Sequence, residues 1–326
     1  MSANHLSNLA LRGAPSATAQ NTKNSAKYSA KPSADYDLHV RQAITVLHEA
    51  AALGDVTQAS SLGAEDVVIT HLINQLQLHI PVFVLDTGAL HTETLALLER
   101  TQATSRTPIN VYRPERVAVM NFVRSHGQKA IYDTVELRKN CCDIRKMEPL
   151  ARALAGKRGW ITGLRREQSN TRAEVPLTEA AAPDGSSIAK FNPLANWTWG
   201  DIWHYIAEHE VDYNPLHDQF YPSIGCAPCT RAVTLGEDFR SGRWWWENDD
   251  ARECGLHVKP HSDAPALLSA QRADRASEVP AQAHAAAGGA RGAPAPGRSQ
   301  NEDLKEWGLH VKRATTPNEQ QQKAPA

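Results

Sequence analysis

Residues 57–66 read Thr-Gln-Ala-Ser-Ser-Leu-Gly-Ala-Glu-Asp, and this order predicts a strand, a turn and the start of a helix. The residues up to Leu62 favour a short strand, and Gly63 favours the turn that follows it. Small side chains let a backbone approach a phosphate group, and a helix N-terminus offers N–H groups to it. The stretch is equally compatible with an ordinary turn and helix cap, so alone it does not decide the function.

The same alternation of strand and helix continues along the chain. Apolar residues recur at helical spacing in three segments, and short apolar runs between them predict strands. The expected helices cover 40–50, 67–76 and 92–100, and the expected strands cover 57–62, 82–85, 109–112 and 160–163. This alternation predicts an α/β fold, with a parallel sheet and helices on both faces, which binds ligands beyond the carboxyl ends of its strands. Those ends are 60–66, 86–88 and 163–172.

The composition excludes several classes of protein. The 326 residues are 41% hydrophobic and 22% charged, and 35 basic residues nearly balance 36 acidic ones. This balance gives no general reason to bind nucleic acid or an anionic membrane, so we expect neither partner. No apolar run approaches the roughly 20 residues that span a bilayer, and the N-terminus lacks an apolar signal core. We therefore expect a cytoplasmic protein.

Five cysteines are too few for a secreted disulfide scaffold, and their number is odd. Four of them form two pairs, Cys141-Cys142 and Cys226-Ala-Pro-Cys229, and four thiolates suffice for a tetrahedral zinc or a 4Fe–4S cluster. Adjacent cysteines bind one metal ion only with a strained backbone, which the separated irons of a cluster relieve better than a single zinc does. A redox dithiol of Cys226 and Cys229 would leave the adjacent pair unexplained. The sequence therefore favours a cluster first, zinc second and a redox dithiol third.

The fifth cysteine, Cys254, has no partner at metal-ligand spacing. It lies in Glu-Cys-Gly-Leu-His (253–257), a polar stretch near the end of the segment that we expect to fold. A lone cysteine is usually a small buried hydrophobic residue, but Glu, Gly and Arg flank this one. The setting favours a mobile nucleophile whose thiol pKa is lowered by nearby Arg and His side chains.

Six motifs occur in order along the chain and carry a family resemblance. They are Ser-Ser-Leu-Gly-Ala-Glu-Asp (60–66), Leu-Asp-Thr-Gly (85–88), Cys-Cys-Asp-Ile-Arg-Lys (141–146), Gly-Leu-Arg-Arg-Glu-Gln-Ser-Asn-Thr-Arg (163–172), Gly-Cys-Ala-Pro-Cys-Thr (225–230) and Glu-Cys-Gly-Leu-His (253–257). With them, the chain resembles the assimilatory adenylyl-sulfate (adenosine 5′-phosphosulfate) reductases of the phosphoadenylyl-sulfate reductase family through most of 40–259. The resemblance implies an adenine-nucleotide α-hydrolase-like sheet and a flexible C-terminal catalytic arm.

The resemblance also implies a reaction, which is thioredoxin-dependent reduction of adenylyl sulfate to sulfite and AMP in sulfate assimilation and cysteine biosynthesis. An S-sulfocysteine forms on Cys254, and reduced thioredoxin or a glutaredoxin-like reductant then releases sulfite. The implied cofactor is one 4Fe–4S cluster per chain, on Cys141, Cys142, Cys226 and Cys229. The implied catalytic residues are Cys254, His257, Lys146, Arg240 and Arg243. The implied substrate-binding residues are Ser60, Ser61, Gly63, Glu65, Leu85, Thr87, Gly163, Arg165 and Arg172.

The basic residues in and between these motifs have a plain physical role, because cations beside a sulfate neutralise the charge that develops there. Arg145 is the exception, since we interpret it as a solvated surface residue. His217 could be mistaken for a metal ligand, but the thiolates already supply four ligands. A structural role for His217 near the cluster is therefore favoured.

The chain is predicted to divide into four parts. Residues 1–34 contain no acidic residue, one aromatic residue and many Ser, Ala, Asn and Lys, which is typical of a disordered tail. Residues 261–300 contain no Phe, Trp or Tyr, so they cannot bury enough surface to offset their ordering entropy. The predicted parts are a disordered N-terminal tail (1–36), a nucleotide- and cluster-binding reductase domain (37–247), the catalytic arm (248–259) and a low-complexity tail (260–326). Within that tail, 301–312 repeats 248–259 with Trp307 in place of Cys254, and a relic of duplication is favoured over a decoy arm.

Two alternative functions stay open. Reduction of the 3′-phosphorylated substrate needs only one or two further cations, although relatives specific for it commonly lack the two cysteine pairs. A non-enzymatic iron–sulfur or zinc sensor would need no nucleophile away from its cluster. The sequence is compatible with a homo-oligomer and does not define its size.

Overall fold

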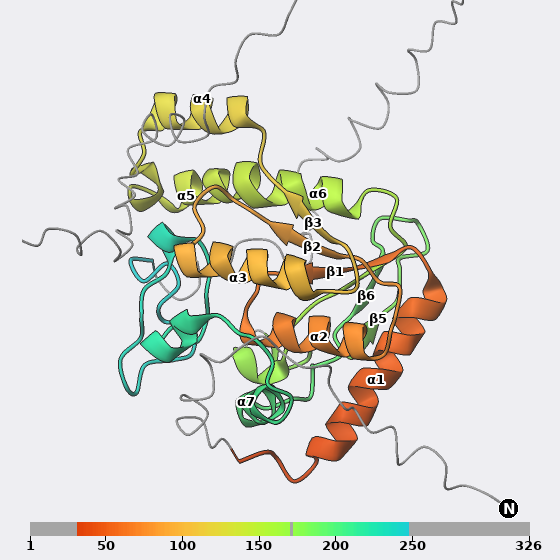
Figure 1. Ribbon diagram of the computed structural model, residues 1–326. Helices are drawn as coiled ribbons and strands as arrows, with labels where there is room; N and C mark the ends of the chain where they lie inside the picture. Colours follow the sequence, from red (N-terminus) through yellow and green to blue (C-terminus); the bar gives the residue numbers. More distant parts are fainter. Residues whose placement is uncertain (1–30, 170–171, 248–326) are drawn as a thin grey trace, which may run out of the picture. The chain divides into compact units, whose positions relative to one another are not determined.

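The computed structural model describes residues 31–169 and 172–247 and is organised around a six-stranded sheet (Figure 1). The strands are β1 (Val56–Ser60), β2 (Val82–Leu85), β3 (Ile109–Tyr112), β4 (Gly159–Ile161), β5 (Thr178–Glu179) and β6 (Ala189–Phe191). Their order in the sheet is β3-β2-β1-β4-β6-β5. All neighbouring strands are parallel except β5, which pairs antiparallel with β6.

Helices cover both faces of this sheet (Figure 1). On one face lie α1 (Tyr36–Leu53), α2 (Ala64–Gln75), α3 (Thr92–Thr104) and α7 (Trp199–Glu208), whose apolar residues form one cluster with Val84. On the other face, α6 (Glu148–Leu154) packs Leu150 against Phe83 and Trp160. Val84 and Phe83 point to opposite faces because side chains alternate along a strand. Strand β2 is thus covered on both sides, which explains its unbroken apolar run.

The remaining described elements lie between β3 and β4, between β4 and β5, and after β6. The longer ones are α4 (Arg116–His126), α5 (Val135–Cys142) and a π-helical turn, η2 (Asp143–Met147), which joins α5 to α6. The 3₁₀ segments are η1 (Ala130–Tyr132), η3 (Arg166–Gln168), η5 (Pro215–Gln219) and η6 (Ala227–Cys229). Segments η5 and η6 belong to the region after α7 that carries the second cysteine pair.

The predicted α/β fold with helices on both faces of a parallel sheet is confirmed. Strands β2 and β3 cover the residues expected for them, whereas β5 and β6 were not expected and make one edge of the sheet antiparallel. Residues 31–36, which we assigned to the N-terminal tail, include Ser33, whose N–H donates to Asp201 Oδ1 at 2.7 Å. Among the described residues, no helix is both long and apolar enough to cross a membrane.

Several predictions concern residues outside the described part of the chain. These are the catalytic arm (248–259) with Cys254 and His257, the tail beyond it with the repeat at 301–312, and residues 1–30.

Candidate active site

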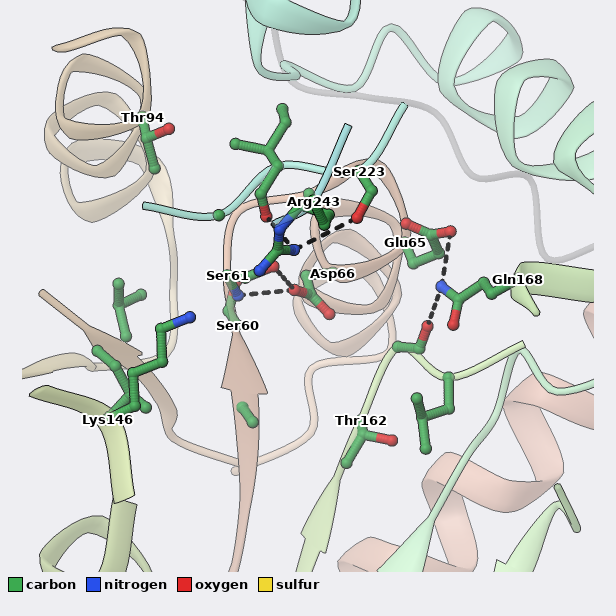
Figure 2. Close-up of a pocket in the computed structure, with 18 of the residues that line it drawn as sticks. Ser60, Ser61, Glu65, Asp66, Thr94, Lys146, Thr162, Gln168, Ser223 and Arg243 are labelled. Atoms are coloured by element: carbon green, nitrogen blue, oxygen red, sulfur yellow. Dashed lines mark hydrogen bonds between the residues drawn. The ribbon is translucent and has the colours of Figure 1, made fainter. Parts of the chain in front are cut away.

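A pocket lies at the carboxyl ends of β1, β2 and β4, where a parallel sheet binds its ligands (Figure 2). It is lined by all predicted substrate-binding residues except Arg165, together with three of the predicted catalytic cations. The predicted residues in the lining are Ser60, Ser61, Gly63, Glu65, Leu85, Thr87, Gly163, Arg172, Lys146, Arg240 and Arg243. Cys226 lines the pocket too, so the predicted nucleotide site and the cysteines adjoin each other.

The turn after β1 is held by its own side chains. Leu62 adopts a left-handed conformation with a φ of 61°, and its N–H donates to Ser60 Oγ at 3.2 Å. Ser61 donates from its N–H and its hydroxyl to Asp66 Oδ2, at 2.6 and 2.7 Å. Helix α2 then begins at Ala64, with Gly63 as its N-cap. The positive end of the α2 dipole therefore lies at the pocket, where it favours an anion.

Gly163, directly beyond β4, lies against α2 with no room for a side chain. A Cβ atom at this position would lie 2.5 Å from Asp66 Oδ1 and 3.0 Å from Glu65 Cβ. The sequence placed Gly163 in the substrate site, and the structure supplies the reason for a glycine there. Its backbone must approach the first turn of α2 closely.

Two buried carboxylates at the start of α2 have opposite pKa shifts. Burial raises the pKa of Asp66 to about 6, although hydrogen bonds from Ser61 oppose the shift. Burial acts in the same direction on Glu65, but the charge of Arg165 and a hydrogen bond from Gln168 outweigh it and lower the pKa. Glu65 is therefore ionised at neutral pH, and its charge adds to the shift of Asp66.

Arg165 lies behind the pocket and holds Glu65 in place. Its side chain is 1% exposed, and it donates from Nε to Glu65 Oε1 at 2.9 Å and from Nη1 to Glu167 Oε2 at 2.7 Å. The guanidinium carbon also lies 5.4 Å from the centre of a Trp199 ring and 5.8 Å from that of Phe239. This geometry directs Arg165 to protein partners, so its predicted contact with substrate gains no support from the structure.

A chain of polar contacts joins Arg172 to the same network. Arg172 Nη1 donates to Gln168 Oε1. Gln168 Nε2 in turn donates to Glu65 Oε1 at 3.0 Å and to the carbonyl oxygen of Gly163 at 3.1 Å (Figure 2). The loop after β4 is thereby fastened to α2 across the pocket wall.

Cations from two parts of the chain meet at the pocket. Figure 2 shows Lys146, from η2, and Arg243, from the segment after η6, pointing toward the turn at Ser60 and Ser61. Arg243 is 7% exposed, and its Nη1 donates to Ser223 Oγ and to the carbonyl oxygen of Ile224, both at 3.4 Å. Its Nε atom has no hydrogen-bond partner among the described residues. The guanidinium carbon also lies 4.6 Å from the centre of a Trp244 ring. A buried guanidinium whose described hydrogen-bond partners are both neutral favours an anionic ligand.

The described cysteines gather beside this pocket and form no disulfide with one another. Cys226 and Cys229 pack with Ile131 and Trp244, and Cys141 packs against the same cluster. Burial, and next the charge of Cys226, raises the pKa of Cys229 to about 12, and burial also raises the pKa of Cys141. Burial therefore opposes ionisation of Cys141 and Cys229, and a positively charged centre bound between the cysteines would offset that cost. In the described ranges, no three His, Cys, Asp or Glu side chains converge as they would on a single metal ion.

Thr87 connects the cysteines to the pocket. Its Oγ1 lies 3.2 Å from Cys226 Sγ, and its carbonyl oxygen accepts from Arg145 Nη1 at 2.7 Å. Arg145 is half-buried in this contact, so its interpretation as a solvated surface residue was wrong. The π-helical turn η2 contains Arg145 and changes the directions of its side chains relative to an α-helix, which helical spacing in the sequence does not reveal.

Other pocket residues were not assigned to the site from the sequence. They include Asp66, Thr94, Thr162, His217, Ser223 and Phe239. Asp66 stood in a quoted motif and offered a signal, whereas Thr94 lies within α3 and offered none. His217 is buried in the lining, with Nδ1 2.8 Å from the carbonyl oxygen of Tyr221, and the sequence had given it a structural role.

The sheet, the turn after β1 and the cations at the strand ends define an α/β protein built to bind a phosphate-bearing ligand. The chain belongs to the family of the phosphoadenosine phosphosulfate reductase domain, whose model matches residues 55–232. The family resemblance inferred from the six motifs is therefore confirmed.

Two similar proteins both carry the name adenosine 5′-phosphosulfate reductase. The one from Allochromatium vinosum is 53% identical over 205 residues, which cover 63% of this chain and 79% of that protein. The one from Burkholderia cepacia is 51% identical over 212 residues, which cover 65% of this chain and 84% of that protein. A crystal structure of phosphoadenylyl-sulfate (PAPS) reductase from Candida auris, as a phosphate complex, is 27% identical with a TM-score of 0.50. The matched region covers 59% of this chain and 90% of the Candida auris chain.

Proposed function

We propose that the protein reduces adenylyl sulfate to sulfite and AMP in sulfate assimilation and cysteine biosynthesis, with reduced thioredoxin or a glutaredoxin-like protein as the electron donor. The observation that carries this proposal is Arg243, a buried guanidinium at the pocket whose neutral partners, Ser223 and Ile224, are 3.4 Å away. A buried cation is costly without a counter-ion, and the sulfate group of adenylyl sulfate supplies one. The names of the similar proteins from two bacteria support the same substrate.

Different pocket residues would bind the phosphate and the sulfate group of the substrate. The turn at Ser60–Gly63 and the N-terminus of α2 suit the phosphate, because a helix N-terminus favours an anion. Lys146, Arg240 and Arg243 suit the sulfate group, since their positive charge lowers its repulsion of an approaching thiolate. They also neutralise the charge that builds on the phosphate as AMP leaves.

Cys254 is the nucleophile in this proposal. Its thiolate attacks the sulfate sulfur, a bond forms between the two sulfur atoms, and the bond from sulfur to the phosphate oxygen breaks so that AMP leaves with the electron pair. A thiolate of the donor then attacks Cys254 Sγ and expels sulfite. The second donor thiol attacks the resulting mixed disulfide, which returns Cys254 as a thiol and leaves the donor as a disulfide.

The cysteine donor set fits an iron–sulfur group. Cys141, Cys142, Cys226 and Cys229 would hold one 4Fe–4S cluster per chain, with zinc as the second choice, because four thiolates are the ligands that such a centre takes. When bound, this group supplies a structural cross-link and a fixed charge beside the pocket. The hydroxyl of Thr87 lies beside Cys226, the first cysteine of the second pair, and Arg145 donates to the carbonyl oxygen of Thr87.

The test is to trap the covalent intermediate. After mixing with adenylyl sulfate in the absence of a donor, mass spectrometry should show one added sulfonate on Cys254 and release of AMP. Cys254→Ser should still bind AMP, but it should form no adduct and release no sulfite. An adduct on Cys226 or Cys229 would overturn the assignment, and competition with the 3′-phosphorylated nucleotide measures the strictness for substrate.

A second variant tests the anion site. Arg243→Gln should slow adduct formation strongly, because the sulfate would then lose its buried counter-ion. The matched control is Arg166→Gln, which removes an arginine that bonds the carbonyl oxygen of Val175 outside the pocket lining. Equal adduct rates in the two variants would contradict the role of Arg243.

A further inference from the structure

Three aromatic side chains form an exposed patch beside the second cysteine pair. We call Tyr132, Trp245 and Trp246 the aromatic patch. The Tyr132 ring centre lies 4.5 Å from that of Trp246 and 6.5 Å from that of Trp245, and the two tryptophans are 4.8 Å apart. Tyr132 is 40% exposed and Trp245 is 37% exposed. Contiguous exposed aromatic surface of this kind is typical of protein interfaces.

The structure beneath the patch holds it in place. Trp244, the neighbour of Trp245, is fully buried and lies under the guanidinium of Arg138 at 4.7 Å. Arg138 in turn forms a buried two-pronged ion pair with Glu247. The hydroxyl of Tyr132 donates to the carbonyl oxygen of Pro228 at 2.7 Å. The aromatic rings are therefore presented on a rigid base, which lowers the entropic cost of binding a partner.

The position of the patch along the chain points to its partner. Glu247 is the last described residue before Cys254, and seven residues of extended chain reach at most roughly 24 Å. Any thiol that attacks Cys254 Sγ must therefore come within that distance of Glu247. Trp245 and Trp246 directly precede Glu247. A protein bound to the patch therefore lies close enough for its thiol to reach Cys254.

We propose that the aromatic patch is the docking surface for the protein dithiol that discharges the sulfonated cysteine. This inference rests on the proposed function, because it presupposes an adduct on Cys254 that a donor thiolate attacks. The partner is a small protein whose redox dithiol is surrounded by apolar surface. Trp245 supplies the exposed apolar anchor for it, and Tyr132 and Trp246 support that ring.

The two halves of the reaction allow the patch to be tested separately from the chemistry. Trp245→Ala should form the sulfonated adduct at the wild-type rate, and dithiothreitol should discharge it equally fast. With thioredoxin as the donor, the KM for the donor should rise about tenfold or more, as expected for removal of an interface tryptophan. Trp245→Phe should recover part of this loss. Met120→Ala on α4 is the matched control, because Met120 is 36% exposed and should leave the KM unchanged.

Each contrary result has a distinct meaning. An unchanged KM for thioredoxin in Trp245→Ala would refute the docking surface, and so would equally slow discharge by dithiothreitol. A lower KM would show that a segment of this chain, such as 301–312, occupies the patch, and altered sedimentation would show a contact between copies. Both findings would overturn the proposal. Absence of any adduct in the wild-type protein would instead refute the proposed function itself.

Discussion

Glu247→Gln should destabilise the protein by about 3–5 kcal/mol, the loss expected when one partner of a buried ion pair is removed. Arg138 and Glu247 are 0% and 3% exposed in their side chains, and Arg138 donates from Nε and Nη2 to the two carboxylate oxygens at 2.8 and 2.6 Å. Glutamine keeps the shape of the glutamate, removes its charge and replaces one of the two acceptor oxygens with an NH2 donor. The guanidinium then remains buried without its counter-ion, beside the Trp244 ring and Cys142.

The measurement is urea unfolding followed by tryptophan fluorescence, on variants prepared in the same way. With a denaturant slope of about 2–3 kcal/mol/M, the midpoint should fall by about 1–2 M. The matched control is Glu148→Gln, which breaks the Arg152–Glu148 pair on the surface, where both side chains are 41% exposed. That loss should stay below about 1 kcal/mol.

Two outcomes would refute this reasoning. Midpoints for Glu247→Gln and Glu148→Gln that agree within error would show that burial does not amplify the Arg138 pair. A double variant, Arg138→Met with Glu247→Met, should recover much of the stability, because a buried ion pair can be replaced by apolar side chains without large loss. If the double variant is less stable than Glu247→Gln, the penalty arises from packing and not from the unpaired charge.

Three further predictions follow from the pocket and the tail. Gly163→Ala should weaken AMP binding about tenfold or more, because its Cβ would lie 2.5 Å from Asp66 Oδ1, and calorimetry that finds an unchanged Kd would contradict this close approach. Asp66→Asn should remove a pH dependence of stability: the Asp66 pKa rises from 3.8 to about 6 on folding, so its contribution is complete below 3.8 and is lost as pH rises through about 6. Urea midpoints at about pH 4 and about pH 7 should therefore differ less in the variant than in the wild type. Deleting 261–326 should leave a folded protein of unchanged turnover, and a several-fold rise in turnover would make the tail a regulatory element.

The sheet and the place of the site were predictable because they follow from short-range patterns. The apolar run of β2 and the strand-to-turn order at 57–66 are local signals. Parallel strands also bring their carboxyl ends to one edge of the sheet, independently of the conformation of the loops. Ser60, Thr87 and Gly163 therefore came together as expected. Strands β5 and β6 were missed because two or three residues are too few to show a period of two.

The directions of charged side chains were not predictable in the same way. Arg165 and Arg243 were both predicted to contact the substrate, yet Arg165 bonds Glu65 and Arg243 lines the pocket. The partner of Arg165 is 100 residues away along the chain, so no local pattern identifies it. Arg145 was interpreted as a solvated surface residue because its partner, the carbonyl oxygen of Thr87, lies 58 residues away along the chain. Tertiary contacts decided each of these cases.

The π turn at Asp143–Met147 has a consequence for how this chain tolerates insertions and deletions. One residue of an α-helix corresponds to about 100° of rotation around its axis, so removing one residue here would let α5 and α6 fuse into a regular helix and rotate one against the other. Cys142 on α5 and Leu150 on α6 could then not both keep their present neighbours. The number of residues between the first cysteine pair and α6 therefore determines how α5 is rotated relative to α6. A change of one residue there is more damaging than most substitutions.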